Sequence, residues 1–263
     1  MNILLTGDDG YNSIGIRLLI HYLHKEHKLT VVGTKTQQSA VGGKLHVKDG
    51  CAYTQTKLDN IDAYVVDGAP ADAMEFANVW FKEKRFDLII SGMNLGENIS
   101  SGMISSGTVS AAVRAYGLEL APKAIAISWY TPGDFYFKKH DETESLAGYL
   151  DHPGESLKKT IELCIKHNLW DAKILNINLP KKPASEIRFT HINLNINDSY
   201  PPPHIQKDQQ RFAYPFEMLP RATTDLSLDS AAIEAGYISI TPINPDWTEY
   251  DLYEKMKNDV LNC

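Results

Sequence analysis

Two adjacent acids, Asp8 and Asp9, stand in a polar turn directly after the apolar run at residues 3–5. Adjacent carboxylates repel each other unless a positive group lies beside them, and a hard divalent cation with oxygen ligands is a natural partner. Ser39 and Asn94 follow two other apolar runs, so the four side chains make an all-oxygen set from three predicted strand ends. The alternative is that the Asp-Asp-Gly sequence only forms a turn and caps the next helix.

The segment Ser106-Gly107-Thr108 opens a predicted helix and is a candidate anion site. Glycine permits close approach, the first N–H groups of a helix point outward, and the helix dipole favours negative charge there. An ordinary Ser or Thr helix cap explains the segment equally well. No Walker sequence or GxGxxG fingerprint occurs, and the turn at residues 7–10 puts acids where a pyrophosphate would sit, so a dinucleotide site is not expected.

The elements that must position these side chains alternate between strands and helices over the first two-thirds of the chain. A weak alternation around an Asp-Gly pair also predicts a hairpin over residues 44–56. The pattern predicts an α/β fold with a doubly wound, mostly parallel sheet in a three-layer, Rossmann-like arrangement, which binds ligands at the carboxyl ends of its strands. The predicted strands are 3–5, 29–32, 64–66, 88–91, 124–128 and 174–178, and the predicted helices are 16–23, 70–80, 108–115 and 142–167.

The character of the sequence changes after residue 180. Residues 181–235 contain a run of three prolines, further prolines and few helix signals, so we predict an extended arm or hairpin without a core of its own. Residues 236–241 then predict a strand, and 247–261 predict a helix. The expected organisation is an α/β core that carries the site over 1–180, the arm over 181–235, and a closing strand with a C-terminal helix over 236–263.

Composition narrows the class of protein. The chain has 263 residues, 43% of them apolar and 22% charged, and a formal charge of −7. This acidity argues against nucleic acid as the main ligand, because backbone binding needs a basic surface. The cysteines Cys51, Cys164 and Cys263 are far apart and predict free thiols. No apolar run approaches the roughly 20 residues of a membrane span or resembles a signal peptide, so we expect a cytoplasmic protein with no membrane partner.

Taken together, the motifs resemble those of the SurE-type survival proteins, a family of metal-dependent nucleoside monophosphate phosphatases. The motifs are, in order, Asp8-Asp9-Gly10-Tyr11, Gln38-Ser39, Gly68-Ala69-Pro70-Ala71-Asp72, and residues 91–98 and 106–112. Residues 175–180, Thr224-Asp225 and residues 236–242 complete the series near the end of the chain. No single motif is decisive, but their order is highly specific and spans nearly the whole chain.

The resemblance implies both an activity and an assembly. The activity is hydrolysis of phosphate monoesters, nucleoside 5′- or 3′-monophosphates, in which Asp8 or Asp9 orients or deprotonates the attacking water. The arm is expected to exchange between subunits of a homodimer or homotetramer. The implied ligands of one divalent cation per subunit, Mg²⁺, Mn²⁺ or similar, are Asp8, Asp9, Ser39 and Asn94. The implied phosphate-binding residues are Gly96, Asn98, Ser106, Gly107 and Thr108.

Two positions depart from the family pattern. Gly7 stands where the family usually has Asn, and Ser100 replaces a glycine two residues after Asn98. Gly7 removes an amide beside the acid pair, so the alternative function is a catalytically weakened sensor or scaffold that binds metal and nucleotide. A zinc-dependent deacetylase with His-Pro before its acid pair matches poorly, because Thr6-Gly7 lacks the nitrogen ligand that zinc prefers.

Overall fold

The computed structural model describes residues 1–83, 85–131, 133–136, 138–215 and 223–257. Within these residues the chain forms one nine-stranded sheet and a separate two-stranded hairpin. The strands of the sheet are β1 (Asn2–Thr6), β2 (Lys28–Thr34), β3 (Tyr53–Leu58), β4 (Ile61–Val66), β5 (Leu88–Leu95), β6 (Ala124–Trp129), β7 (Ile174–Leu179), β8 (Ile187–Phe189) and β11 (Ile238–Ile243). The hairpin strands are β9 (His204–Gln206) and β10 (Arg211–Ala213).

The strand order confirms the doubly wound sheet. It runs β3-β4-β2-β1-β5-β6-β7-β11-β8. Neighbouring strands from β4 to β7 are parallel, while β3 and β11 pair antiparallel with β4 and β7. The chain builds outward from β1 through β2 and β4, and then places β5, β6 and β7 on the other side. The carboxyl ends of β1 and β5 therefore form the topological switch point, where open α/β sheets bind their ligands.

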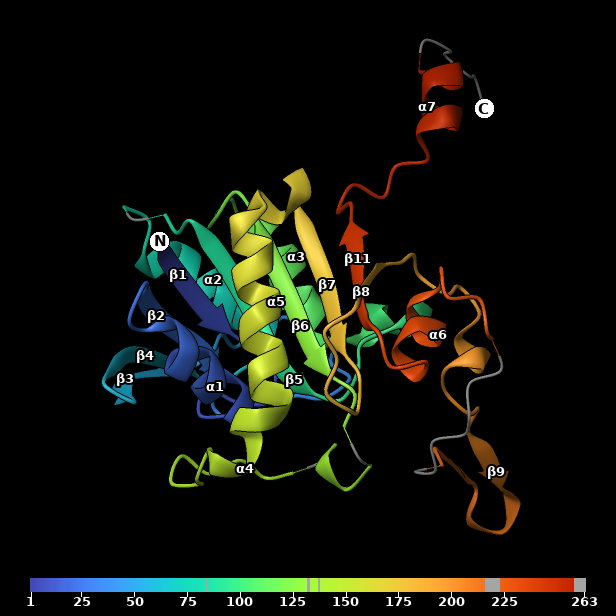
Figure 1. Cartoon of the computed structure of the whole chain (residues 1–263), viewed down its shortest axis with the longest axis horizontal. Coiled ribbons are helices and arrows are strands. Elements are labelled where there is room, and N and C mark those ends of the chain that lie inside the picture. The colour runs from blue at the N-terminus through green and yellow to red at the C-terminus, as the bar shows by residue number, and fades with distance from the viewer. Residues whose placement is uncertain (84, 132, 137, 216–222, 258–263) are drawn as a thin grey trace.

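Helices cover both faces of this sheet, as Figure 1 shows. The helices are α1 (Ile14–Leu23), α2 (Pro70–Trp80), α3 (Gly107–Gly117), α4 (Ala147–Tyr149), α5 (Glu155–Lys166), α6 (Asp229–Glu234) and α7 (Tyr250–Met256). Helices α1 and α5 pack on one face and α2 and α3 on the other, each pair over its own cluster of buried apolar side chains. The result is the predicted three-layer arrangement, which parallel sheets require because their strands are apolar on both faces.

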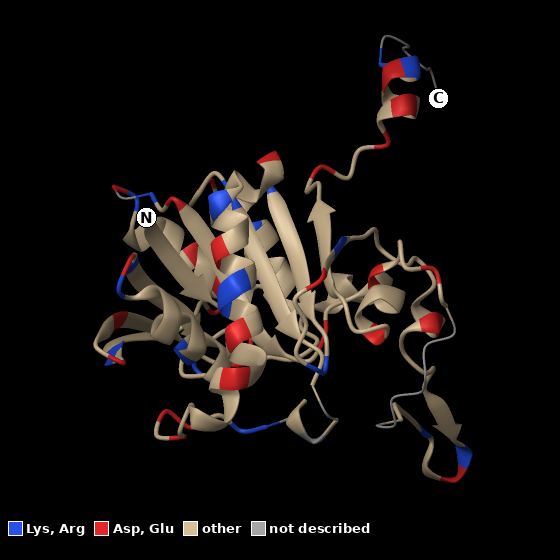
Figure 2. Ribbon diagram, in the orientation of Figure 1, with Lys and Arg blue, Asp and Glu red and all other residues tan. Residues whose placement is uncertain are grey.

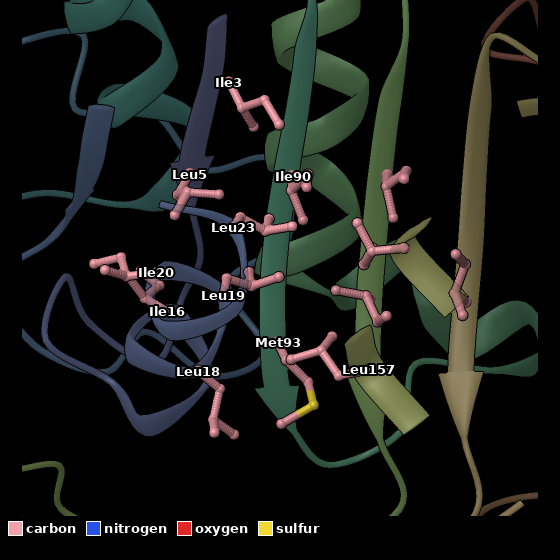
Figure 3. Close-up of a cluster of buried hydrophobic side chains, with 14 of the residues drawn as sticks. Ile3, Leu5, Ile16, Leu18, Leu19, Ile20, Leu23, Ile90, Met93 and Leu157 are labelled. Carbon is pink, nitrogen blue, oxygen red and sulfur yellow. The ribbon is translucent and has the colours of Figure 1, made fainter. Parts of the chain in front are cut away.

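Helix α1 illustrates how the sequence positions a helical layer against the sheet. Ser13 caps the helix, because its hydroxyl oxygen accepts a hydrogen bond from the N–H of Ile16 at 3.3 Å. The apolar stripe of the helix, which includes Leu19 and Leu23, packs toward Leu5 of β1 and Ile90 of β5 (Figure 3). Each such fully buried side chain contributes roughly 2 kcal/mol to the free energy of unfolding. This packing holds the end of β1 firmly against β5.

Lys, Arg, Asp and Glu residues are found mostly on the helices, turns and loops and on the outer strands (Figure 2). Strands β1, β5, β6 and β7 contain no Lys, Arg, Asp or Glu, because both faces of these strands are covered. Asp8 and Asp9, just beyond β1, are exceptions to this separation, since each is buried with 5% of its surface exposed. Buried carboxylates at a strand end need compensation from their surroundings.

The predicted hairpin over residues 44–56 is wrong in position. Residues 44–52 form turns and irregular backbone, and the hairpin joins β3 to β4 instead. Its turn residues Asp59 and Asn60 have φ angles of 46° and 67°. Two successive residues at positive φ are typical of the type I′ turn, which Asp and Asn tolerate. The alternation was weak because β3 is an edge strand with little buried surface.

The long helix predicted over residues 142–167 is also wrong in extent. Regular helix begins only at α5, after the single turn of α4 and a wider turn over 150–154. His152 is extended, with φ −150° and ψ 128°, as a residue before proline prefers to be. Pro153 itself has no N–H to donate to a helix. The shorter helix leaves residues 138–146 as a loop near the carboxyl ends of the strands.

The C-terminal third is more closely attached to the sheet than a free arm. β8 pairs with β11, the predicted closing strand, and α6 packs against β11 and β7. The β9–β10 hairpin and α7 lie apart from the body of the sheet (Figure 1). Helix α7 falls within the predicted helix 247–261, of which residues 258–261 are outside the described residues. In the described part of the chain, no helix is both long and apolar enough to cross a membrane.

Candidate active site

The loops after β1, β2 and β5 meet the N-terminus of α3 at the switch point and enclose a cavity of ≈ 200 Å³. Asp9, Gly107 and Thr108 are not among the lining residues. The cavity is lined by Asp8, Ser39, Ala40, Asn94, Leu95, Gly96, Glu97, Asn98, Gly102, Ser105, Ser106 and Tyr136. The fold thus gathers residues from sequence positions far apart into one pocket of the size of a small ligand.

Asp8 lies at the inner end of this cavity. Its Oδ1 accepts a hydrogen bond from the hydroxyl of Thr108, in the first turn of α3. Gly107 permits this close approach, because a Cβ atom at that position would lie 2.7 Å from the Cβ of Asp8. Thr108 is fully buried. Its hydroxyl therefore holds the carboxylate of Asp8, and in this structure it does not face the cavity where we expected the phosphate.

Asp9 is held by groups from two other loops. Its Oδ2 accepts a hydrogen bond from the backbone N–H of Leu95 at 2.8 Å, and its Oδ1 accepts one from the side-chain amide of Gln37 at 3.0 Å. Gln37 also donates to the carbonyl of Tyr136 at 3.0 Å. Asp9 therefore joins the ends of β1, β2 and β5 and has little freedom to reorient.

Ionisation of the two carboxyl groups is unfavourable in the absence of a cation. Burial raises the pKa of Asp8 above its ordinary value. Burial raises the pKa of Asp9 as well, and the neighbouring charge of Asp8 raises it further. Among the described residues, no Lys or Arg forms an ion pair with either carboxylate. This site is therefore electrostatically suited to a bound cation.

Asn94 and Ser39, the other two residues of the predicted oxygen set, line the same cavity as Asp8. The pairing of β5 with β6 shifts register between Ser91 and Asn94, and a bulge of this kind re-aims side chains at a strand end. The Asn94 amide nitrogen donates to the carbonyl of Gly96 at 2.7 Å, which leaves its oxygen as the atom available to a cation. Ser39 is exposed on a loop that is fixed beside Asp8, because the N–H of Gln38 donates to the Asp8 carbonyl at 2.7 Å.

The N-terminus of α3 and the loop after β5 border the same cavity. The hydroxyl oxygen of Ser106 caps α3 by accepting a hydrogen bond from the N–H of Val109 at 3.1 Å. The preceding loop is tied to the sheet at Asn98, whose amide nitrogen donates to the hydroxyl of Ser128 at 2.8 Å. The cap does not prevent anion binding at this helix N-terminus, because the helix still has outward N–H groups and its dipole.

The two departures from the family pattern have different structural settings. Ser100 has a φ of 55°, the left-handed region that favours glycine, and its N–H donates to Oδ2 of Asp229 at 2.7 Å. At Gly7, a Cβ atom would lie 3.4 Å from the nitrogen of Gly92, which is an ordinary contact. A Cβ atom is therefore accommodated at Gly7, so packing against Gly92 does not require a glycine there.

Tyr136 is a cavity residue that sequence reasoning missed. A Cβ atom on Gly96 would lie 2.7 and 2.8 Å from two carbons of the Tyr136 ring, so the ring rests directly on that glycine. Its hydroxyl donates to the carboxylate of Glu97, which is 5% exposed. Burial raises the pKa of Tyr136, so the phenol stays protonated at neutral pH. The sequence feature that could have identified Tyr136 is its position after the carboxyl end of β6, because α/β sheets bind ligands at that edge.

His140 is a second residue that the sequence did not indicate. Its side chain is 3% exposed, and its Nδ1 accepts a hydrogen bond from the N–H of Ile14 at 3.3 Å. The proton of the neutral ring therefore lies on Nε2, which is 3.9 Å from Oδ2 of Asp9. Burial lowers the pKa of His140 to about 4, so the ring is neutral at pH 7. Nε2 has no hydrogen-bond partner within the described residues.

At 3.9 Å the Nε2–H of His140 does not hydrogen-bond to Asp9 in this structure, but a small movement would bring it within hydrogen-bond distance of Oδ2. We therefore expect His140 to position Asp9 when a cation is bound, as outer groups do for metal ligands. His140→Leu should weaken the binding of Mn²⁺ about tenfold, at the lower end of the effect of groups that orient metal ligands. His140→Gln keeps an N–H donor and should retain most of the affinity. Isothermal titration of both variants with Mn²⁺ measures this, and equal affinity in wild type and His140→Leu would contradict the role.

Comparisons with known proteins point to one family. The family model described as "Survival protein SurE" matches residues 3–199 of this chain. The 5′-nucleotidase SurE of Alkaliphilus metalliredigens is 31% identical over 265 residues, covering 98% of this chain and 98% of the relative. The 5′-nucleotidase SurE of Syntrophobacter fumaroxidans is 29% identical over 260 residues, covering 97% of this chain and 98% of the relative.

A solved structure is similar along the whole chain. The crystal structure of the SurE protein from Aquifex aeolicus superposes with a TM-score of 0.74 and covers 98% of both chains. Its sequence identity to this chain is 24%. At that identity the similarity establishes the shared fold, a mostly parallel sheet with flanking helices.

Proposed function

Because this chain belongs to the SurE family of survival proteins, we propose that it hydrolyses nucleoside 5′- or 3′-monophosphates to nucleoside and phosphate. The observation that carries the proposal is the buried pair Asp8 and Asp9 beside a cavity at the switch point of the sheet. The curated relatives are named 5′-nucleotidases, so the activity of this chain is a phosphomonoesterase activity of that class. The substrate is small, and neither nucleic acid nor a membrane is expected as a partner.

The donor set supports one divalent cation per subunit, Mg²⁺, Mn²⁺ or a similar ion. Asp8, Asp9, Ser39 and Asn94 offer carboxylate, hydroxyl and amide oxygens, which hard cations prefer. The buried pair also lacks a cationic partner among the described Lys and Arg residues. When bound, the cation would polarise a phosphoryl oxygen and acidify a water molecule.

The protein residues have separable tasks in this reaction. Asp8 lines the cavity and would orient the attacking water and accept its proton, while Thr108 holds one of its oxygens in place. Asp9 lies behind it, held by Leu95 and Gln37, and so serves as a rigid charged partner. The N-terminus of α3 at Ser106 and Gly107, with the loop at Gly96 and Asn98, would stabilise charge on the phosphoryl oxygens.

The ring of Tyr136 is in position to contact the nucleoside of the substrate. It lines the same cavity as Asp8 and rests on the loop at Gly96. We expect Tyr136→Ala to raise KM for nucleoside monophosphates about tenfold, because stacking of a base on an aromatic ring contributes roughly 1–3 kcal/mol. Glycerol phosphate, which has no base, should show little change in KM. A loss of the same size for both substrates, measured by phosphate release, would contradict a base contact.

The experiment that tests the proposed function is phosphate release from a panel of 5′- and 3′-nucleoside monophosphates, with Mg²⁺, with Mn²⁺ and with chelator. We expect turnover that depends on the added cation. Full activity in chelator would contradict the metal-dependent reaction. The alternative function, a weakened sensor or scaffold, would instead show nucleotide and metal binding by calorimetry without turnover.

Variants of Gly7 test further whether the protein is an active phosphatase or a weakened sensor or scaffold. Since a Cβ atom at this position makes only ordinary contacts, Gly7→Asn should place an amide beside the acid pair and raise turnover if the site is poorly organised. Gly7→Ala is the matched control, because it adds a Cβ atom without an amide. Equal kcat in the two variants would show that the missing amide has no role.

The exposed β9–β10 hairpin supports the proposal of an exchanged arm. Ile205 and Phe212 on the hairpin are 74% and 60% exposed, and Tyr214 directly after it is 67% exposed. Such a group of exposed apolar side chains is typical of a contact surface. We propose that residues 204–213 pack on another subunit of a homodimer or homotetramer in the cytoplasm. Light scattering of the purified chain distinguishes these assemblies from a monomer.

A further inference from the structure

A second cluster of metal-ligating side chains lies outside the cavity. Within the described residues, His46, Cys51 and Asp72 each point one ligand atom into a common space, and these atoms lie within 4.8 Å of one another. His46 and Cys51 belong to the loop between β2 and β3, and Asp72 lies in the first turn of α2. None of the three is within the set Asp8, Asp9, Ser39 and Asn94, and no sequence spacing of a known zinc motif indicated them.

Asp72 is a pre-oriented ligand. Its Oδ2 accepts a hydrogen bond from the N–H of Ala69 at 2.8 Å, and its Oδ1 accepts one from the N–H of His46 at 2.9 Å. Two backbone donors therefore fix the plane of the carboxylate, and 11% of the side chain is exposed. Carboxylates that ligate metals are commonly oriented by hydrogen bonds of this kind.

The other two ligand atoms lie close to the Asp72 carboxylate. Nδ1 of His46 lies 2.7 Å from Oδ2 of Asp72, and Sγ of Cys51 lies within 4.8 Å of the ligand atoms of both residues. The sulfur packs over Gly68, where a Cβ atom would lie 2.5 Å from Sγ. A nitrogen, a sulfur and an oxygen thus lie within 4.8 Å of one another, close enough to bind one cation after small movements.

We propose that His46, Cys51 and Asp72 form a second metal site that binds Zn²⁺, with water as the fourth ligand. Zinc accepts imidazole nitrogen, thiolate sulfur and carboxylate oxygen together, whereas Mg²⁺ does not favour thiolate. Binding releases the thiol proton of Cys51 to solvent, and moves the remaining proton of the His46 ring to Nε2. One thiolate and one carboxylate then neutralise the two charges of the cation.

The geometry requires only small movements. Zinc bonds of about 2.0–2.3 Å in a tetrahedron separate the ligand atoms by roughly 3.3–3.8 Å. The distance between Nδ1 of His46 and Oδ2 of Asp72 must therefore increase from 2.7 Å. A pair of ligand atoms near the upper limit of 4.8 Å must move closer together. His46 is free to make the adjustment, since its side chain is 34% exposed on an irregular loop. The same exposure gives the metal and its water access from solvent.

The site joins two parts of the chain that matter for the candidate active site. The loop over residues 35–52 carries Ser39, and a metal at its far end would cross-link it to α2. This consequence rests on the proposed function, but metal binding by His46, Cys51 and Asp72 does not. A cross-link of this kind stabilises the folded state whenever the metal is bound.

Cobalt titration of the metal-free full chain tests the proposal. Co²⁺ replaces Zn²⁺ in such sites, and a thiolate ligand gives a charge-transfer band in the near ultraviolet. With Mg²⁺ in excess to occupy oxygen sites, we expect one equivalent of Co²⁺ to produce this band and Zn²⁺ to remove it. The band should be lost in Cys51→Ser, and His46→Gln should need at least tenfold more Co²⁺ to develop it.

Two control variants keep the result specific. Cys164→Ala removes a different thiol, and Asp9→Asn disables the candidate active site, and both should retain the band at full height. Zn²⁺ should also raise the melting temperature of the wild type and leave that of Cys51→Ser unchanged. The absence of a band in the wild type, or a band that persists in Cys51→Ser, would overturn the proposal without affecting the proposed hydrolysis.

Discussion

Asp9→Asn should abolish the binding of divalent cations and lower kcat/KM for nucleoside monophosphates by on the order of a thousandfold. The change keeps the shape of the side chain and removes its charge. Loss of one group that stabilises developing charge commonly costs a hundredfold to a thousandfold in rate, and loss of the cation that Asp9 is expected to hold removes such a group from the site. Wild-type activity in this variant would overturn the assignment of Asp9.

The same variant should make the metal-free protein more stable at neutral pH. Burial raises the pKa of Asp9 in the folded state above its unfolded value, so the folded state favours the protonated acid. The stabilisation that this proton gives is complete below pH 3.8, and it is lost as the pH rises through the folded-state pKa. Asparagine does not titrate and therefore avoids this loss.

Thermal unfolding in chelator, at pH 7 and at pH 3.5, measures the effect. The melting temperature of Asp9→Asn should exceed that of the wild type at pH 7, and the difference should shrink at the lower pH. Asp62→Asn is a matched control, because Asp62 is an exposed acid on β4 that pairs with Lys57 at 3.1 Å. It should leave metal binding unchanged.

Thr108→Val should lower kcat/KM about thirtyfold and also weaken cation binding. Its hydroxyl donates to Oδ1 of Asp8 in a buried setting. A hydrogen bond to a charged group contributes about 2 kcal/mol, which corresponds to roughly a thirtyfold change in an equilibrium or a rate. Had Thr108 contacted only the phosphate, cation binding would be unchanged, so measuring both quantities on one preparation distinguishes the two roles.

The pH profile gives an independent measure of this role. The hydrogen bond from Thr108 lowers the pKa of Asp8, opposing the rise that burial causes. Without the donor, the pKa of Asp8 rises further, and the ionised carboxylate forms only at higher pH. The acid limb of kcat/KM should therefore move to higher pH in Thr108→Val. Thr108→Ser retains a hydroxyl and should restore the wild-type profile; an unshifted limb in Thr108→Val would contradict the contact.

The elements of the core could be predicted because their signals are local. A run of consecutive apolar residues indicates a strand buried on both faces, and the stripe with Ser13 before it indicates a capped helix. The sequence failed where a local signal was weak or overlooked. β3 lacks a buried face, its turn at Asp59 and Asn60 was not recognised, and Pro153 divides the segment predicted as one helix.

The sequence by itself determined the fold class, the family and the position of Asp8 and Asp9 at a strand end. Only the tertiary structure decided which side chains meet there. Thr108 reaches Asp8 across 100 residues of sequence, and the amide of Gln37 reaches Asp9 across 28. Such pairings depend on the strand order and on how each loop packs, and neither is encoded in the spacing of a motif.

The same reason explains the residues that the sequence did not indicate. Tyr136 and His140 both follow β6. The arrangement of strands in the sheet, and not the order along the chain, brings Tyr136 to the cavity and His140 beside Asp9. Cys51, which the sequence predicts to be a free thiol, is one in this structure, but the fold places it against Asp72. Local patterns specify the elements, because backbone hydrogen bonds and burial act over a few residues; the packing of those elements specifies the chemistry.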